Sequence, residues 1–194
     1  MSPRPFAEEE AEEVLLALGS NLGDRLAHLR AGVRGLMQSV KLDAISPVVE
    51  SRPQGVADAD EQDDYLNAVL RGWTVLAPRP LLDACLAVER GEGRTRGRPG
   101  APRTLDVDIL FYGSRVVDRP GLRIPHRRWA ERAFVLLPLR AVAAEWRDPE
   151  SGRSVEEVCR ERLDRLAPVR IAHPASALDP RGAGAASAHS REPS

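Results

Sequence analysis

The sequence contains a single lysine, Lys41, so the 28 lysines and arginines together include 27 arginines. This scarcity excludes two classes of phosphate-binding protein. The P-loop of nucleotide hydrolases requires a lysine directly after its glycines, and a protein kinase requires a lysine on a strand. If this protein binds phosphate groups, arginine side chains must bind them.

Cysteine is also scarce, since the chain has only Cys85 and Cys159. Neither has a partner at metal-ligand spacing, so the sequence indicates neither a disulfide framework nor a zinc site, and we expect two buried thiols. Long apolar runs are missing, and the first 13 residues are acidic where a signal peptide is basic and then apolar. We therefore expect a cytoplasmic protein that does not associate with membranes.

Excess charge and aromatic residues are lacking as well, with a net charge of −1 and 4% aromatics. This balance provides no bulk attraction to nucleic acid, so we expect no nucleic-acid partner, and a monomer is the expected state. The 194 residues fit one domain. We expect an acidic disordered N-terminus over 1–12, a single domain over 13–170, and a disordered tail over 171–194, which is rich in Ala, Gly, Ser and Pro.

Apolar patterning predicts a mixture of strands and helices. The expected strands are 14–18, 43–51, 65–76 and a short hairpin strand near Val116, and the expected helices are 26–36, 81–90 and 154–166. These elements do not alternate strictly, and the consecutive strands 43–51 and 65–76 favour antiparallel pairing. The pattern therefore favours the α+β class over a doubly wound parallel sheet.

The segment "PRTLDVDILFYG", residues 102 to 113, places two aspartates in an apolar strand. Leu105, Val107 and Ile109 share one face, so Asp106 and Asp108 project together from the other, roughly 7 Å apart at the backbone. Carboxylates at this spacing can share one divalent ion or hold two ions, and magnesium suits such a site. The alternative is a half-buried strand whose aspartates face solvent.

An arginine-rich and glycine-rich loop, residues 90 to 103, leads into this strand. Arginine binds phosphate oxygens through two nitrogens at once, so the loop next to the aspartates indicates phosphate binding. A solvated loop without a role, an RNA-binding segment and a two-metal nucleotidyltransferase are the alternatives. The last of these is suggested by Gly19 and Ser20, although they lie more than eighty residues before Asp106.

Four motifs occur in order: "LALGSNLGDR", "DYLNAV", "APRTLDVDILFYG" and "IPHRRWAERAFVLLPL". Together they resemble the 6-hydroxymethyl-7,8-dihydropterin pyrophosphokinases of folate biosynthesis, over about residues 13 to 145. The resemblance implies a ferredoxin-like α/β/α sandwich in three layers with a central antiparallel sheet. It also implies transfer of the β,γ-diphosphate of ATP to the pterin hydroxymethyl oxygen, with release of AMP and the use of two Mg²⁺ ions.

The resemblance also implies roles for individual residues. Asp106 and Asp108 would bind both metal ions and act in catalysis together with Arg94 and Arg96. The residues implied to bind ATP are Arg94, Arg96, Arg103, His126 and Arg132. The residues implied to bind the pterin are Ser51, Gly55, Tyr65, Asn67 and Phe134, with the two aromatics on either side of the ring and the Asn67 amide at its polar edge.

Overall fold

The structure, a computed structural model, describes residues 11–55, 59–94 and 100–180. Its strands are β1 (Glu12–Ser20), β2 (Lys41–Ile45), β3 (Val48–Ser51), β4 (Tyr65–Thr74), β5 (Asp106–Tyr112), β6 (Val117–Arg119), β7 (Leu122–Ile124) and β8 (Arg170–His173). Its helices are α1 (Arg25–Leu36), α2 (Pro78–Gly91), α3 (Ala133–Ala143) and α4 (Val155–Arg162), and its 3₁₀ turns are η2 (Ala59–Glu61), η3 (Trp129–Glu131), η4 (Leu163–Arg165) and η5 (Ala175–Ala177).

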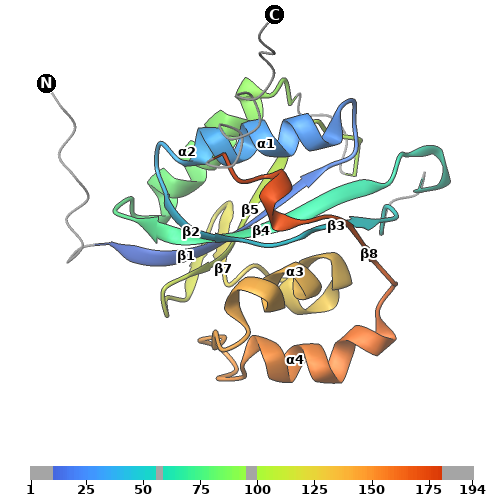
Figure 1. Ribbon diagram of the computed structural model, residues 1–194. Coiled ribbons are helices and arrows are strands. Elements are labelled where there is room, and N and C mark those ends of the chain that lie inside the picture. The colour runs from blue at the N-terminus through green and yellow to red at the C-terminus, as the bar shows by residue number, and fades with distance from the viewer. Residues whose placement is uncertain (1–10, 56–58, 95–99, 181–194) are drawn as a thin grey trace, which may run out of the picture.

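Six of the described strands form one antiparallel sheet in the order β5, β1, β4, β3 and β8, and β2 pairs with residues 70–73 of β4. Helices α1 and α2 cover one face of this sheet, whereas α3 covers the other face and α4 packs on the outside of α3 (Figure 1). Strands β6 and β7 form a separate hairpin. The predicted ferredoxin-like α+β sandwich is confirmed.

The helices on the first face follow from their apolar spacing and their caps. Helix α1 begins after Asp24, whose side chain accepts a hydrogen bond from the Ala27 backbone nitrogen at 3.0 Å. Its buried residues Leu29, Val33 and Leu36 recur at helical spacing. Helix α2 begins with a proline at its first position and is followed by Gly93, whose positive φ of 75° suits the turn after it. Both helices therefore lie where the sequence pattern predicts them.

Strand β5 contributes to both apolar cores. Leu105, just before the strand, packs with Val107 and Ile109 in the core beneath α1 and α2. Leu110 and Phe111 both pack toward α3, because the pairing of β5 with β1 shifts its register by one residue at Leu15 and Leu16. The predicted apolar face of the strand is confirmed, and Asp106 and Asp108 lie on the opposite face.

Two predicted boundaries differ from the structure. The single strand expected over 43–51 is interrupted at Ser46 and Pro47, because Pro47 has no backbone N–H to donate, and β2 and β3 each pair with β4. At the N-terminus, β1 already begins at Glu12, whereas residues 1–10 lie outside the described part.

The prediction of a disordered tail from residue 171 is wrong for residues 171–180. Strand β8 pairs antiparallel with β3, and Leu178 is 2% exposed and belongs to the core beneath α1 and α2. Four strand residues carry too little periodicity to be recognised alone, and their backbone partners come from distant β3. Residues 181–194 lie outside the described part.

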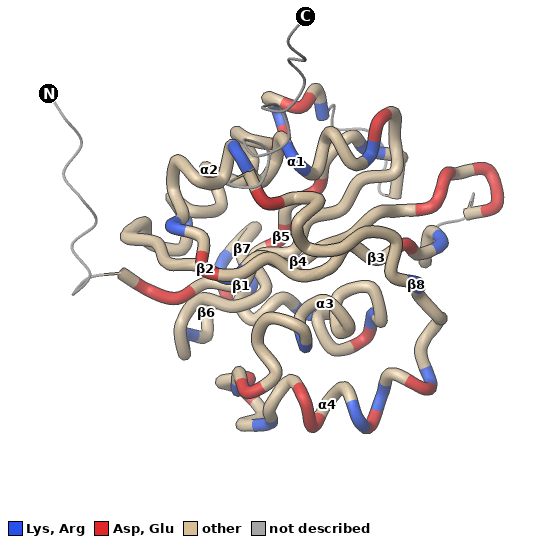
Figure 2. The backbone as a smooth tube through the Cα atoms, viewed as in Figure 1, with Lys and Arg blue, Asp and Glu red and all other residues tan. Residues whose placement is uncertain are grey.

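Residues of both charge signs are distributed along most of the backbone, and acidic residues gather in the segment before β4 (Figure 2). None of the helices in the described part combines the length and the apolar character that crossing a bilayer requires.

Candidate active site

The register of three strands places the candidate residues in rows across the face of the sheet that α3 covers. Gly19 of β1 lies opposite Asn67 of β4 on one side and opposite Asp106 of β5 on the other. One pair further along, Ala17 lies opposite Asp108. Because neighbouring strands are about 4.8 Å apart, Asn67 and Asp106 lie roughly 10 Å from each other across Gly19.

A pocket opens over these rows, and we call it the first pocket. Small side chains form its floor, since Ala17 and Gly19 line it at the positions that follow the buried Leu15 on the same face of β1. Nine of the predicted site residues line it: Ser51, Tyr65, Asn67, Arg103, Asp106, Asp108, His126, Arg132 and Phe134. The structure therefore brings together residues that span more than eighty positions of the sequence.

Two of the predicted residues that the structure describes, Arg94 and Gly55, do not line this pocket. Arg94 lies next to it and contacts Asp106. Gly55 has a positive φ of 72°, and a Cβ atom there would lie 4.0 Å from a guanidinium nitrogen of Arg128. Arg96 lies outside the described residues.

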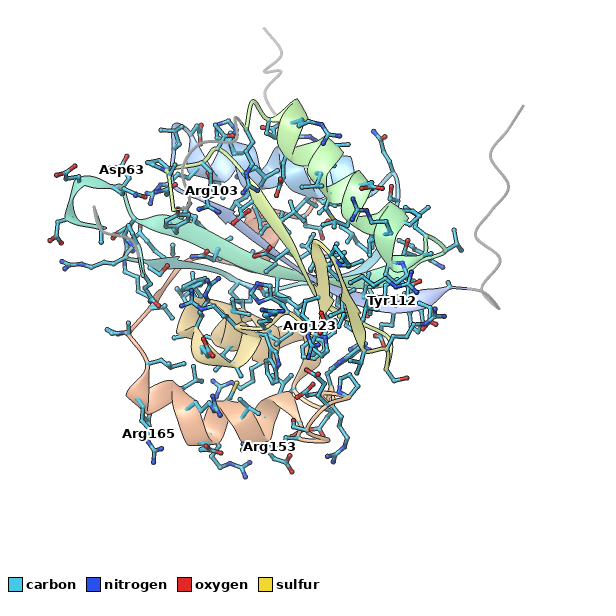
Figure 3. The ribbon with its side chains drawn as sticks, turned by 180° about the vertical axis from the view of Figure 1, so that it is seen from behind. Asp63, Arg103, Tyr112, Arg123, Arg153 and Arg165 are labelled. Carbon is cyan, nitrogen blue, oxygen red and sulfur yellow. The ribbon has the colours of Figure 1, made fainter. Side chains whose placement is uncertain are left out.

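Two arginines from the arginine-rich loop bind the carboxylate of Asp106. Arg103 donates from Nη1 to Oδ2 at 2.6 Å, and Arg94 donates from Nη1 to Oδ1. Figure 3 shows Arg103 at the beginning of β5. Both carboxylate oxygens are thus neutralised by cations that approach from the loop.

A third carboxylate, that of Glu89 in α2, belongs to the same network of ion pairs. It is 4% exposed, pairs with Arg94, and accepts a hydrogen bond from the backbone nitrogen of Val107 at 2.8 Å. Burial raises the pKa of Glu89. Our sequence analysis missed Glu89, although a carboxylate four residues after Cys85 on the buried stripe of α2 is a usable signal.

Asp108 has a different environment from Asp106. The Nε2 atom of the His126 ring lies 3.9 Å from Asp108 Oδ2, too far for a hydrogen bond. Burial and the neighbouring Asp106 carboxylate raise the pKa of Asp108. Asp108 therefore lies beside the like charge of Asp106, and an added cation would stabilise its ionised form.

Two hydrogen bonds fix the position of His126, one through its backbone and one through its ring. Its backbone nitrogen donates to the Leu110 carbonyl at 3.0 Å, and its Nδ1 accepts from the Arg128 backbone nitrogen at 3.2 Å. A neutral ring that accepts at Nδ1 carries its proton on Nε2, the atom that faces Asp108. Burial lowers the pKa of His126, so the neutral form is favoured.

The opposite side of the first pocket combines an amide with a hydroxyl. Asn67 donates from Nδ2 to Ser51 Oγ at 3.0 Å, and both residues are buried. A Cβ atom at Gly19 would lie 3.1 Å from Asn67 Oδ1, so the glycine leaves room for that oxygen. The amide of Asn67 is thus fixed in orientation and has its acceptor next to the pocket floor.

Aromatic rings form two walls of the same pocket. Tyr65 lines it from β4 and Phe134 lines it from the first turn of α3. The guanidinium of Arg132 lies over the Phe134 ring at 5.5 Å from the ring centre. Burial raises the pKa of Tyr65, which keeps its hydroxyl protonated at neutral pH.

Asn21 joins the segments around the pocket, and our sequence analysis also missed this role. Its Oδ1 accepts from the Arg103 backbone nitrogen at 2.8 Å, and its Nδ2 donates to Gln62 Oε1 at 3.1 Å. Gln62 in turn donates to the Gly100 carbonyl at 3.0 Å. A buried asparagine directly after a strand was the available signal, since such a side chain requires partners.

A second pocket adjoins the first, and the two share Asp108 and His126. Its other lining residues are Leu82, Ile109, Gly121, Leu122, Arg123, Arg127 and Arg128. Figure 3 shows Arg123 on the β6 and β7 hairpin. Two pockets, one with aromatic walls and one with arginines, therefore meet at one aspartate.

The donor set suits magnesium better than a metal held by protein ligands alone. Among the described residues, no three His, Cys, Asp or Glu side chains gather as a metal site. Asp106 and Asp108 together provide two carboxylates on a rigid strand. Mg²⁺ binds through one or two carboxylates and completes its coordination with water and substrate phosphates, so these residues fit the ion.

Comparisons with known proteins agree with this geometry. The sequence model of the family "7,8-dihydro-6-hydroxymethylpterin-pyrophosphokinase (HPPK)" matches residues 15–144. A 2-amino-4-hydroxy-6-hydroxymethyldihydropteridine pyrophosphokinase of Pseudomonas aeruginosa is 40% identical over 161 residues, which cover 80% of this chain and 97% of the relative. The protein of the same name from Haemophilus influenzae is 38% identical over 77% of this chain and 92% of its own length.

A larger relative and a solved structure share part of their length with this chain. The mitochondrial folate synthesis bifunctional protein of Arabidopsis thaliana is 42% identical over 66% of this chain, which corresponds to 23% of that protein. The crystal structure of Plasmodium falciparum HPPK-DHPS superimposes with a TM-score of 0.64 at 13% identity. It covers 80% of this chain and 45% of its own chain, and at this identity the likeness concerns the fold.

Proposed function

The chain belongs to the 7,8-dihydro-6-hydroxymethylpterin-pyrophosphokinase family, and we propose that the two pockets meeting at Asp108 form its active site. The reaction is transfer of the pyrophosphoryl group of ATP to hydroxymethyldihydropterin, a step in folate biosynthesis. The observation that carries the site assignment is the row Asn67, Gly19 and Asp106. In this row an amide and a carboxylate lie on either side of a glycine that has no side chain.

The pterin occupies the first pocket in this proposal. Tyr65 and Phe134 provide apolar walls for a flat ring, Gly19 gives the ring a floor without a side chain, and Asn67 meets its polar edge. An amide offers both a donor and an acceptor, as the edge of an aminopyrimidinone requires. Ser51 fixes the orientation of that amide, and Gly55 is proposed to approach the ring through its backbone.

ATP occupies the second pocket and extends its phosphates toward Asp108. Arg94, Arg103, Arg132 and His126, together with Arg96, are proposed to bind the phosphate oxygens, since cations and a neutral imidazole N–H all donate to them. Leu82 lines the same pocket and provides an apolar contact. The hydroxymethyl group and the phosphates then meet above β5.

Asp106 and Asp108 are proposed to hold two Mg²⁺ ions between the substrates. When bound, the ions neutralise the charge of the transferred group and make the attacking oxygen more acidic. Arg94 and Arg103 occupy both oxygens of Asp106 in the structure. We infer that these arginines exchange the carboxylate for phosphate oxygens when substrates load, which brings cationic charge to the transferred group without a covalent intermediate on the protein.

One assay tests the reaction. Incubation with ATP, Mg²⁺ and 6-hydroxymethyl-7,8-dihydropterin is expected to give AMP and the pterin diphosphate in equal amounts. ADP as the nucleotide product, or release of pyrophosphate with an adenylylated pterin, would contradict the proposal. The second of these outcomes would identify a nucleotidyltransferase instead.

We further propose a cytoplasmic monomer. The two cysteines are free and buried, which suits a reducing compartment. All residues proposed for both pockets come from one chain, so a second copy is not required to complete the site. Sedimentation equilibrium at micromolar concentration measures the oligomeric state directly.

A further inference from the structure

A buried carboxylate lies behind the first pocket, on the opposite face of the sheet. Glu50 of β3 is 8% exposed and directly precedes Ser51, which faces the pocket. Consecutive strand residues project to opposite faces, so Glu50 points toward α1. Its Oε1 accepts a hydrogen bond from Arg25 Nη1 at 2.9 Å, and its Oε2 pairs with Arg170 of β8.

Arg25 makes a second contact that connects Glu50 to the next strand. The same Nη1 atom donates to the backbone carbonyl of Asp64 at 2.5 Å. Asp64 directly precedes Tyr65, which is paired with Ser51 in the sheet. The guanidinium therefore joins the two ends of the segment 52–64, where that segment leaves β3 and enters β4.

The beginning of α1 lies over the same end of the sheet as this segment (Figure 1). Arg25 is the first residue of α1, and Asp24, which caps the helix, precedes it, so the backbone of Arg25 is fixed by the helix. Its side chain is anchored by a carboxylate that is almost inaccessible to water. A charge-assisted hydrogen bond of this kind is stronger than a neutral one and holds a narrow geometry.

We propose that Arg25 and Glu50 are positioning residues for the pterin side of the active site, an inference that rests on the proposed function. Their contacts link the two ends of segment 52–64 and so keep β3 and β4 aligned. At this point the two strands present Ser51, Tyr65 and Asn67 to the pocket. Neither residue lines either pocket. They act on the substrate through the strands they hold.

The test is a comparison of the two substrates in the variant Arg25→Ala. The Asp64 carbonyl loses its donor while Glu50 keeps Arg170, so the pterin KM is expected to rise about tenfold, the factor that corresponds to about 1.4 kcal/mol. The KM for ATP is expected to stay within about twofold, and kcat at saturating pterin to change little, because Arg25 contacts none of Asp106, Asp108 and His126.

Two further variants separate this role from a general loss of arginine charge. Arg30→Ala is the matched control, because Arg30 also belongs to α1 but donates to the Ala177 carbonyl at 2.7 Å; neither KM is expected to change. Arg170→Ala removes the other partner of Glu50 but leaves the contact with Asp64, and Arg170 is itself 72% exposed. Its effect on the pterin KM is expected to stay below about threefold.

The outcomes distinguish the positioning role from the proposed function. Calorimetry with the pterin and a non-hydrolysable ATP analogue measures affinity without turnover, and Arg25→Gln provides the same comparison if Arg25→Ala does not fold. An unchanged pterin affinity, or an equal loss for both substrates, would overturn the positioning role. A wild-type protein that neither binds the pterin nor forms AMP would instead overturn the proposed function.

Discussion

The sheet face that α3 covers has two halves, which are built from the same three strands. The halves differ in the size and polarity of their side chains. In the packed half, Leu15 of β1, Val69 of β4 and Phe111 of β5 are fully buried against α3. In the open half, Gly19, Asn67 and Asp106 occupy the corresponding strands. The comparison shows that a core and a candidate active site can share a scaffold and be separated only by side-chain size and polarity along each strand.

The packed half also supports the far wall of the open half. The ring of Phe111 lies edge-on to Trp129 at 5.1 Å between ring centres and contacts Trp146 at 5.9 Å. Trp129 belongs to η3, which directly precedes Arg132 and Phe134. Tight packing around Phe111 therefore fixes the point from which the pocket residues of α3 project.

The largest expected effect in this comparison comes from the carboxylates of the open half. Asp106→Asn and Asp108→Asn keep the side-chain shape but remove the charge, so each is expected to lower turnover by about a hundredfold or more. AMP formation measures turnover, and circular dichroism tests the fold. Asp83→Asn on the exposed side of α2 is the matched control, and near-normal turnover of either site variant would show that the metal assignment is wrong.

A smaller effect is expected from filling the open half. Gly19→Val adds a branched side chain where even one carbon would lie 3.1 Å from Asn67 Oδ1, so the pterin KM is expected to rise by up to about a hundredfold. Gly19→Ala should give an intermediate increase. Gly91→Ala is the control, because a Cβ there meets nothing within 4 Å. If Gly19→Val binds the pterin normally, the floor of the pocket lies elsewhere.

The smallest effect on the chemistry, and the largest on stability, is expected in the packed half. Phe111→Ala should lower the free energy of unfolding by about 3–5 kcal/mol, because it leaves a cavity among tryptophans. Turnover per folded molecule should fall much less than in the aspartate variants. Denaturant unfolding and active-site titration measure the two quantities. A Phe111→Ala variant with wild-type stability and no turnover would contradict the division between a packed half and a catalytic half.

Much of the fold could be predicted because its signals are local. The apolar spacing of Leu29, Val33 and Leu36 identifies α1, and alternation in "TLDVDIL" separates the core face of β5 from the face with the aspartates. The strand that begins at Arg170 could not be predicted this way, because its backbone partners lie on β3 more than a hundred residues earlier. The same holds for Glu89, whose partners Arg94 and Val107 become neighbours only when α2 packs against β5.

The sequence by itself determined which residues are available for chemistry: two carboxylates at strand spacing, arginines as almost the only cations, and small residues at Ala17 and Gly19. The tertiary structure alone decided that Gly19 lies between Asn67 and Asp106. It also decided that Arg25 links the two ends of segment 52–64 by binding Glu50 and the Asp64 carbonyl. The physical reason is that strand alternation and helix periodicity are local properties of the chain. Sheet register and buried ion pairs depend on which distant segments share a core.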